Sequence, residues 1–162
     1  MLHSIHQVRQ EGQGGMDTNI KGTITELKCI TYFLEHGYTV SVPQNPARYD
    51  FILDTGEELL KIQVKTCNTT RKCGTITFNT ASSHYVGGKH THTNYKGDNI
   101  DYFCTYYDNQ CYLVAVEDCG SREKSLFICP TKNGQVKNIA FAKDFIASDV
   151  IENRKKFMQG CE

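Results

Sequence analysis

The segment RYDFILDTGEELLKIQVKT, residues 48–66, constrains the fold of this chain more than any other part of the sequence. It contains two runs of alternating polar and apolar residues, which is typical of a β-hairpin. A turn centred on Gly56 and Glu57 places Asp50 directly opposite Gln63. Because strand side chains alternate with a period of two, one face of the hairpin is apolar and carries Phe51, Leu53, Leu60, Ile62 and Val64. The hairpin therefore predicts an apolar layer on one side of a sheet.

The opposite face of this hairpin collects Asp50, Gln63 and Lys65. Directly opposed residues have Cβ atoms ~5 Å apart, so a carboxylate, an amide oxygen and an ammonium come within reach of one divalent ion and one phosphate. A surface hairpin with one polar face explains the same pattern without any activity. Two features favour a functional site: Lys65 interrupts an otherwise apolar stretch, and the preceding helix carries Glu26 among its apolar positions.

The rest of the sequence predicts an α/β fold around this hairpin. A helix of about four turns begins at Asn19, a favourable N-cap residue, and ends at Gly37. Strands are expected at Tyr38–Pro43, Tyr49–Asp54, Leu59–Cys67, Thr75–Asn79, Ile100–Tyr107, Cys111–Val116 and Leu126–Cys129. The segment Ser82–Asn99 is rich in Gly, His, Thr and Asn and predicts a long loop. One or two peripheral helices should follow between Asn138 and Lys156.

Composition and length exclude several classes of protein. The 162 residues include 18 Lys and Arg and 18 Asp and Glu, so there is no overall basic excess, and any nucleic-acid partner must be recognised locally. No window approaches ~18 consecutive apolar residues, so no membrane span and a cytoplasmic location are expected. Residues 1–15 predict a flexible lead-in, Met16 is a candidate natural start, and residues 16–162 predict a single domain.

The eight cysteines are too few for a disulfide scaffold in a chain of this length, so reduced thiols are expected. Four of them lie in apolar runs and should be small core residues, namely Cys29, Cys104, Cys111 and Cys129. Structural zinc is the weaker alternative, with ligands drawn from Cys67, Cys73, His84, His90 and His92. The absence of a C-x₂-C pair argues against it.

The order of these residues resembles the PD-(D/E)xK nuclease superfamily, and most closely its branch of group I intron-associated homing endonucleases. The resemblance is carried by GTITELK (22–28), HGYTVSVP (36–43), RYDFI (48–52) and KIQVKT (61–66). Asp50 matches the first acid of the motif, Gln63 its second acid, Lys65 its lysine and Glu26 the carboxylate of the helix. Two residues depart from the motif: Tyr49 replaces its proline, and Gln63 replaces its second acid. The resulting Gln-x-Lys sequence resembles the version of the motif in the intron-endonuclease branch.

The resemblance implies a restriction-endonuclease-like core, with a mixed central sheet flanked by helices, and a Mg²⁺-dependent (or Mn²⁺-dependent) endonuclease acting on double-stranded DNA. It assigns Asp50, Gln63, the Val64 carbonyl and Glu26 to the metal, and Lys65 to the attacking water or the phosphate. Since one site cuts one strand, a homodimer or homotetramer is expected. A restriction or Holliday-junction-resolving nuclease on the same core, and a DNA-binding module inactivated by the change at Gln63, remain alternatives.

Two locally basic stretches flank this predicted site, KTCNTTRK (65–72) and KHTHTNYK (89–96). They are either solvated loops or DNA contacts that grip phosphates and enter grooves. The DNA-binding interpretation assigns contacts to Arg71, Lys72, Lys89, His92, Asn94 and Lys96, with Tyr95 as a further base or sugar contact.

Overall fold

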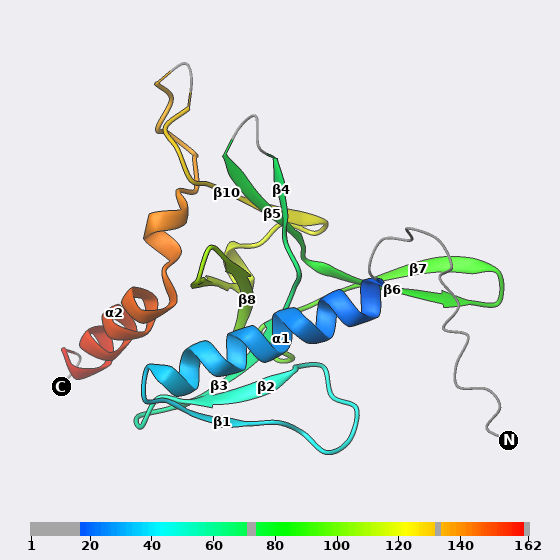
Figure 1. The fold of residues 1–162 in the computed structure, drawn as a ribbon, viewed down its shortest axis with the longest axis horizontal. Helices are drawn as coiled ribbons and strands as arrows, with labels where there is room; N and C mark the ends of the chain where they lie inside the picture. Colours follow the sequence, from blue (N-terminus) through cyan, green and yellow to red (C-terminus); the bar gives the residue numbers. More distant parts are fainter. Residues whose placement is uncertain (1–16, 71–73, 132–133, 161–162) are drawn as a thin grey trace, which may run out of the picture.

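A mixed five-stranded sheet forms the centre of the protein, which is described here by a computed structural model over residues 17–70, 74–131 and 134–160 (Figure 1). Its strands, in spatial order, are β1 (Thr39–Ser41), β2 (Phe51–Asp54), β3 (Leu59–Val64), β8 (Tyr102–Tyr107) and β9 (Gln110–Ala115). Neighbouring strands are antiparallel except for β3 and β8, which are parallel. The predicted α/β fold with a mixed central sheet is confirmed. The predicted lead-in, residues 1–15, and Met16 lie outside the described residues.

The β2–β3 hairpin has the predicted register, because Phe51 pairs with Ile62 and Leu53 with Leu60. The pairing continues one residue further, where the Asp50 N–H donates to the Ile62 carbonyl over 2.8 Å. All five residues of the predicted apolar face are buried. Alternation alone therefore fixed which side chains of this hairpin face the core.

Helix α1 (Thr18–Glu35) packs across one face of the central sheet (Figure 1). Asp17, and not Asn19, is its N-cap: the Asp17 carboxylate accepts from the Asn19 N–H over 2.9 Å. The helix stops before Gly37, whose φ of 80° suits a residue without a side chain. It buries Thr25, Cys29, Tyr32 and Phe33 towards the sheet and leaves Ile20, Ile24, Leu27 and Leu34 exposed.

A second core covers the other face of the central sheet. It contains Phe103 and Val114, which alternate along β8 and β9 with Cys104 and Leu113 of the first core. A three-stranded sheet packs there, formed by β10 (Glu123–Phe127), β5 (Thr75–Asn79) and β4 (Asn68–Thr70). The predicted strand Leu126–Cys129 thus begins three residues too late, and β4 falls in a stretch for which no strand was predicted.

The C-terminal part is helical, as predicted, with the 3₁₀ helix η2 (Ala142–Phe145) followed by α2 (Ala147–Gln159). A further 3₁₀ helix, η1 (Val116–Asp118), lies between β9 and β10. Arg154 of α2 donates two hydrogen bonds to the carboxylate of Glu58, which lies in the turn of the β2–β3 hairpin. Within the described residues, no helix is long and apolar enough to cross a bilayer.

The predicted loop Ser82–Asn99 is wrong for most of its length. The chain forms a hairpin of β6 (Ala81–Val86) and β7 (Lys89–Asn94), closed by Gly87 and Gly88 with φ of 59° and 80°. This hairpin, named the arm here, is a two-stranded sheet that projects from the body beside the N-terminal end of α1 (Figure 1). Neither core includes a residue of the arm whose side chain is described, and a strand outside a core needs no alternation of apolar residues, which is the pattern that normally marks a strand.

Candidate active site

The four side chains predicted to carry catalysis line one pocket between α1 and the edge of the β2–β3 hairpin. Its volume is about 370 Å³, and its wall includes Glu26, Asp50, Gln63, Val64 and Lys65. Glu26 comes from α1, while the others come from the ends of β2 and β3 next to which α1 packs. Antiparallel pairing brings the acid and the amide together, and helix packing adds the second acid.

Asp50 is the centre of the hydrogen bonds in this pocket. Its Oδ2 accepts from the Gln63 amide nitrogen over 2.6 Å and from the Val64 N–H over 2.6 Å. Burial raises the pKa of the Asp50 carboxyl, while the Val64 N–H, the charge of Lys65 and the Gln63 amide oppose that rise. A carboxylate that is desolvated and only partly compensated is a strong ligand for a cation.

Glu26 and Asp50 lie close enough for their charges to interact. The pKa of Glu26 is raised first by burial and second by the negative charge of Asp50. Two carboxylates that repel each other in one pocket are relieved by a cation bound between them. This electrostatic arrangement fits the divalent ion that the sequence predicts.

The donor set also fits a hard cation, since Mg²⁺ and Mn²⁺ prefer oxygen ligands. Carboxylate oxygens come from Asp50 and Glu26, and a neutral carbonyl oxygen comes from Val64. The Gln63 amide points its nitrogen at both Asp50 and the Val64 carbonyl, the latter over 3.2 Å. A half-turn about its last side-chain bond puts the amide oxygen in that place, so Gln63 can serve as a ligand only after this rotation.

Lys65 lies beside Tyr95, which sequence reasoning had assigned to DNA. The Lys65 ammonium is 3.5 Å from the Tyr95 hydroxyl and 4.9 Å from the centre of its ring. Burial lowers the pKa of Lys65, the Asp50 charge opposes this, and Arg48 adds to it. Burial is thus the largest influence on the pKa of Lys65, ahead of the neighbouring carboxylate.

The sequence did not place Arg48 or Tyr95 next to the catalytic residues. The Arg48 guanidinium lies 4.6 Å from the centre of the Tyr95 ring and donates to the Asn94 carbonyl over 3.5 Å. Tyr95 in turn packs edge-on against Phe103 of β8. Arg48 shares the polar face with Asp50 two residues away, a signal that alternation offers. No local signal links Tyr95 to Lys65, because 30 residues separate them.

A pair of threonines joins the two elements that build the pocket. The hydroxyls of Thr25 on α1 and Thr66 after β3 are hydrogen-bonded over 3.0 Å. Each threonine is adjacent in sequence to a site residue, Glu26 and Lys65 respectively. This bond therefore fixes the helix carboxylate against the strand that carries the lysine.

Comparisons with known proteins agree with this geometry. The sequence pattern described as "PD-(D/E)XK endonuclease" matches residues 16–148. The chain belongs to the PD-(D/E)XK endonuclease family. Its fold is similar to the solved structure of a bacterial homing endonuclease, I-Ssp6803I, with a TM-score of 0.70 and 21% identity over 89% of this chain and 98% of that one. None of the curated proteins compared with the sequence matches it.

The structure describes the side chains of three residues predicted to bind DNA, and these three do not line the pocket. Lys89 and Asn94 are exposed on β7 of the arm, and Lys96 is exposed just after it. The backbone of His92 belongs to β7, but its side chain lies outside the described part. Arg71 and Lys72 also lie outside the described residues. Their contacts with DNA remain predictions.

Of the ligands predicted for the alternative zinc site, Cys67 has a side chain in the described part of the protein. Cys67 is half-buried and donates to the Tyr106 carbonyl over 3.5 Å. Cys73 and the side chains of His84, His90 and His92 lie outside the described part. Three of the four predicted core cysteines are buried, whereas Cys129 is exposed, so that prediction is wrong for Cys129. Cys129 follows the end of β10, where the chain has left the second core.

Proposed function

We propose that this protein is a Mg²⁺-dependent endonuclease that hydrolyses phosphodiester bonds of double-stranded DNA, of the homing type. The observation that carries the proposal is the convergence of Glu26, Asp50, Gln63 and Lys65 on one pocket. The Gln-x-Lys sequence and the similarity in fold to a homing endonuclease support the finer assignment.

In this proposal, Asp50, Glu26, the Val64 carbonyl and the rotated Gln63 amide hold the ion. Such an ion polarises the scissile phosphate and lowers the pKa of a bound water. Lys65 directs its ammonium at the attacking water or at the charge that grows on the phosphate. Tyr95 positions Lys65 through its hydroxyl and its ring, and Arg48 supplies a second cation for the phosphate.

The arm is the proposed DNA-binding element. The major groove of B-DNA admits a two-stranded β-ribbon, and the arm is a ribbon of that kind with Lys89 near its tip. Its base leads directly into Asn94 and Tyr95, which contact Arg48 and Lys65. Binding in the groove is thereby connected to the site of cleavage. Arg71, Lys72, His92 and Lys96 complete the proposed contacts.

A homodimer or homotetramer is proposed because a single pocket cuts a single strand. The exposed apolar residues of α1, namely Ile20, Ile24, Leu27 and Leu34, offer a face for a second copy of the chain. They recur at intervals of four, three and seven residues, which is the spacing of helices that pair side by side. Pairing through α1 also places two pockets in one assembly, since α1 carries Glu26.

The direct test is nicking of supercoiled plasmid by the purified protein with Mg²⁺, with Mn²⁺ and with EDTA. We expect nicked and then linear DNA with either ion, and intact plasmid in EDTA. Binding of DNA without nicking under all three conditions would favour the inactive DNA-binding module. Preferred cutting of a four-way junction over a linear duplex of the same sequence would favour a junction-resolving nuclease.

A further inference from the structure

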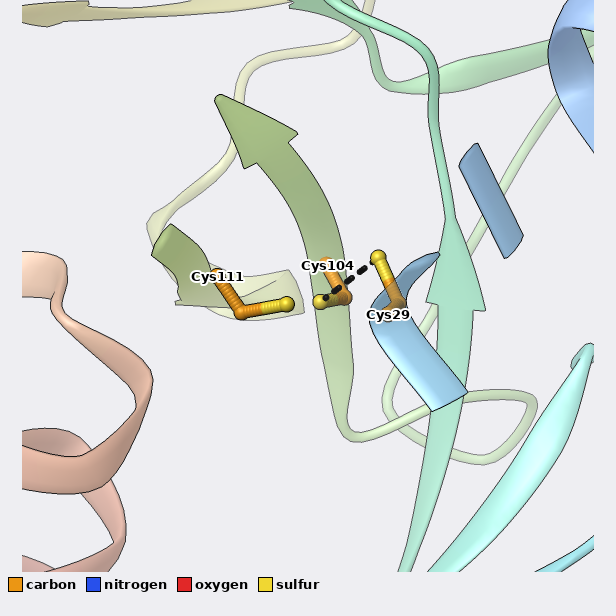
Figure 2. A group of neighbouring side chains, drawn as sticks. All are labelled: Cys29, Cys104 and Cys111. Carbon is orange, nitrogen blue, oxygen red and sulfur yellow. Dashed lines mark hydrogen bonds between the residues drawn. The ribbon is translucent and has the colours of Figure 1, made fainter. Parts of the chain in front are cut away.

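Three cysteines from three different elements meet in the first core. Cys29 lies on α1, Cys104 on β8 and Cys111 on β9, and each is fully buried (Figure 2). Their three sulfur atoms all lie within 4.8 Å of one another, and the Cys104 thiol donates to Cys29 over 3.6 Å. Among the described residues, no other His, Cys, Asp or Glu belongs to this group. We name these three residues the thiol cluster.

The spacing of the thiol cluster matches that of three thiolates around one metal ion. With metal–sulfur bonds of about 2.3 Å, three sulfurs in a trigonal arrangement stand about 4 Å apart. The separations of the three sulfurs therefore allow one ion to contact all of them.

The surroundings restrict which ion fits. Three sulfur donors with no oxygen select soft ions and exclude Mg²⁺. Zinc takes four ligands in almost all structural sites, and here no fourth side chain is available among the described residues. A monovalent ion also brings less charge into this fully buried site than a divalent ion does. We propose that the thiol cluster binds one soft monovalent cation of the copper(I) type through the sulfurs of Cys29, Cys104 and Cys111.

The thiol cluster is next to residues of the active-site pocket. Cys29 follows Glu26 by three residues on α1 and therefore lies on a neighbouring position of the same helix. The Cys104 carbonyl accepts from the Lys65 N–H over 2.9 Å. A bound ion would cross-link α1, which carries Glu26, to β8 and β9, and β8 pairs with β3, which leads into Lys65.

The test uses the full chain with its five other cysteines, Cys67, Cys73, Cys119, Cys129 and Cys161, replaced by serine. Copper(I) is added without oxygen and competed with a chromophoric copper(I) chelator. We expect one equivalent to bind. Loss of an outer partner of a metal ligand already costs about 10- to 100-fold in affinity, so adding Cys29→Ala, Cys104→Ala or Cys111→Ala should weaken binding at least about 100-fold. Undiminished binding by any of these variants overturns the proposal.

Folding is checked separately, because the thiol cluster lies in the core. Circular dichroism melts must show each alanine variant folded before its affinity is compared. X-ray absorption of the copper-loaded five-serine protein gives a second measurement that needs no core substitution, with three sulfur neighbours expected. A first shell containing nitrogen or oxygen, no copper(I) bound by this protein, or Zn²⁺ bound in preference to copper(I), each overturns the proposal. None of these measurements depends on nuclease activity.

Discussion

At the scale of single residues, the Asp50 carboxylate lowers the stability of the fold and is also the proposed central ligand of the ion. Its carboxyl is desolvated, and its pKa is raised from 3.8, so the folded protein holds a proton there more tightly than the unfolded chain does. The free energy of unfolding therefore falls as the pH rises through the range just above 3.8, and it stays lower at neutral pH. A cation in the pocket offsets this cost, which is a reason to keep a carboxylate in an unfavourable place.

Asp50→Asn should abolish Mg²⁺-dependent nicking, with a loss of at least about 100-fold, because it removes the central anionic oxygen from the ion. In EDTA at neutral pH its free energy of unfolding should equal or exceed that of the wild type, since no charge is left to desolvate. Urea titrations and plasmid nicking measure the two effects. Asp54→Asn, on the same face at the other end of β2, is the control and should cut normally. Nicking by Asp50→Asn at the wild-type rate would falsify the site.

Substitutions at Gln63 test whether the Gln-x-Lys motif is active or belongs to an inactive DNA-binding module. Gln63→Ala should lose almost all nicking, because an oxygen ligand is lost. Gln63→Glu should bind Mg²⁺ more tightly and retain some activity, since an added carboxylate attracts the ion and also repels the phosphate. Titration of Mg²⁺ against nicking compares the three proteins. Equal curves for wild type and Gln63→Ala would remove Gln63 from the site.

The Gln63→Glu variant also has a clear expectation without metal. It replaces the Gln63 donor to Asp50 with a second carboxylate, which should lower the free energy of unfolding in EDTA by about 1–3 kcal/mol. Since the pKa of the pair is raised further, this loss should shrink as the pH falls and the pair takes up a proton. Millimolar Mg²⁺ should restore stability at neutral pH. A loss that is independent of both pH and Mg²⁺ would argue against facing carboxylates.

Tyr95 tests whether the lysine needs an aromatic neighbour. Tyr95→Phe removes the hydroxyl 3.5 Å from Lys65 and keeps the ring, so a loss of only a few-fold is expected. Tyr95→Leu frees both cations from the ring and should slow single-turnover cleavage about 10- to 100-fold, with a smaller effect on DNA affinity. Tyr38→Leu removes a comparable contact, with Lys155 of α2, and serves as the control. Equal losses in the Tyr95→Leu and Tyr38→Leu variants would indicate a general structural effect.

At the scale of elements, the sequence predicted those parts whose pattern is set by a core. The β2–β3 hairpin has an apolar face, so its register and the meeting of Asp50 with Gln63 followed from alternation. The strands β8 and β9 were also predicted, from two apolar runs, and the chain turns between them at Asp108 and Asn109, which take the positive φ that such turns need. The family resemblance placed Glu26 near these residues, which alternation alone could not do.

The elements that the sequence missed lack such a pattern. Neither core includes a described side chain of the arm, and its polar strands match the pattern that predicts a loop. Apolar residues recur along α1 at helical spacing, but four of them are exposed, and the helix buries Thr25, Cys29, Tyr32 and Phe33. The contact of Tyr95 with Lys65 depends on the path of the arm. Such long-range contacts are set by tertiary packing and leave no local trace.

If lysines of the arm and of the residues just after it contact DNA phosphates, replacing them should change the salt dependence of DNA binding. Each phosphate contact contributes about 0.9 to the slope of log affinity against log salt. Lys89→Ala and Lys96→Ala should each lower the slope by about this amount and leave the cleavage rate of bound DNA nearly unchanged. Lys143→Ala on η2, an exposed lysine away from the arm, is the matched control. An unchanged slope in both arm variants would exclude these phosphate contacts.

At the scale of the whole molecule, cutting both strands needs two pockets, and the charges beside the apolar face of α1 support a second copy as its occupant. In an antiparallel pair of helices related by a two-fold axis at Lys28, Lys21 of one copy stands opposite Glu35 of the other. Lys28 itself turns towards the Tyr106 ring, 5.2 Å away, which separates the two lysines at the axis. Opposite charges therefore flank an apolar centre in this pairing.

Leu27→Asp should convert the assembly into monomers. Leu27 is 58% exposed, so the substitution leaves the fold intact, but in the pair it would bury an unpaired charge at the centre of the interface. Sedimentation velocity should show the mass fall to that of one chain, and plasmid should be nicked but no longer linearised at low protein concentration. Phe157→Asp on α2, where the side chain is 73% exposed, provides the comparison and should leave the assembly intact. If Phe157→Asp dissociates the protein and Leu27→Asp does not, then α2 and not α1 forms the interface.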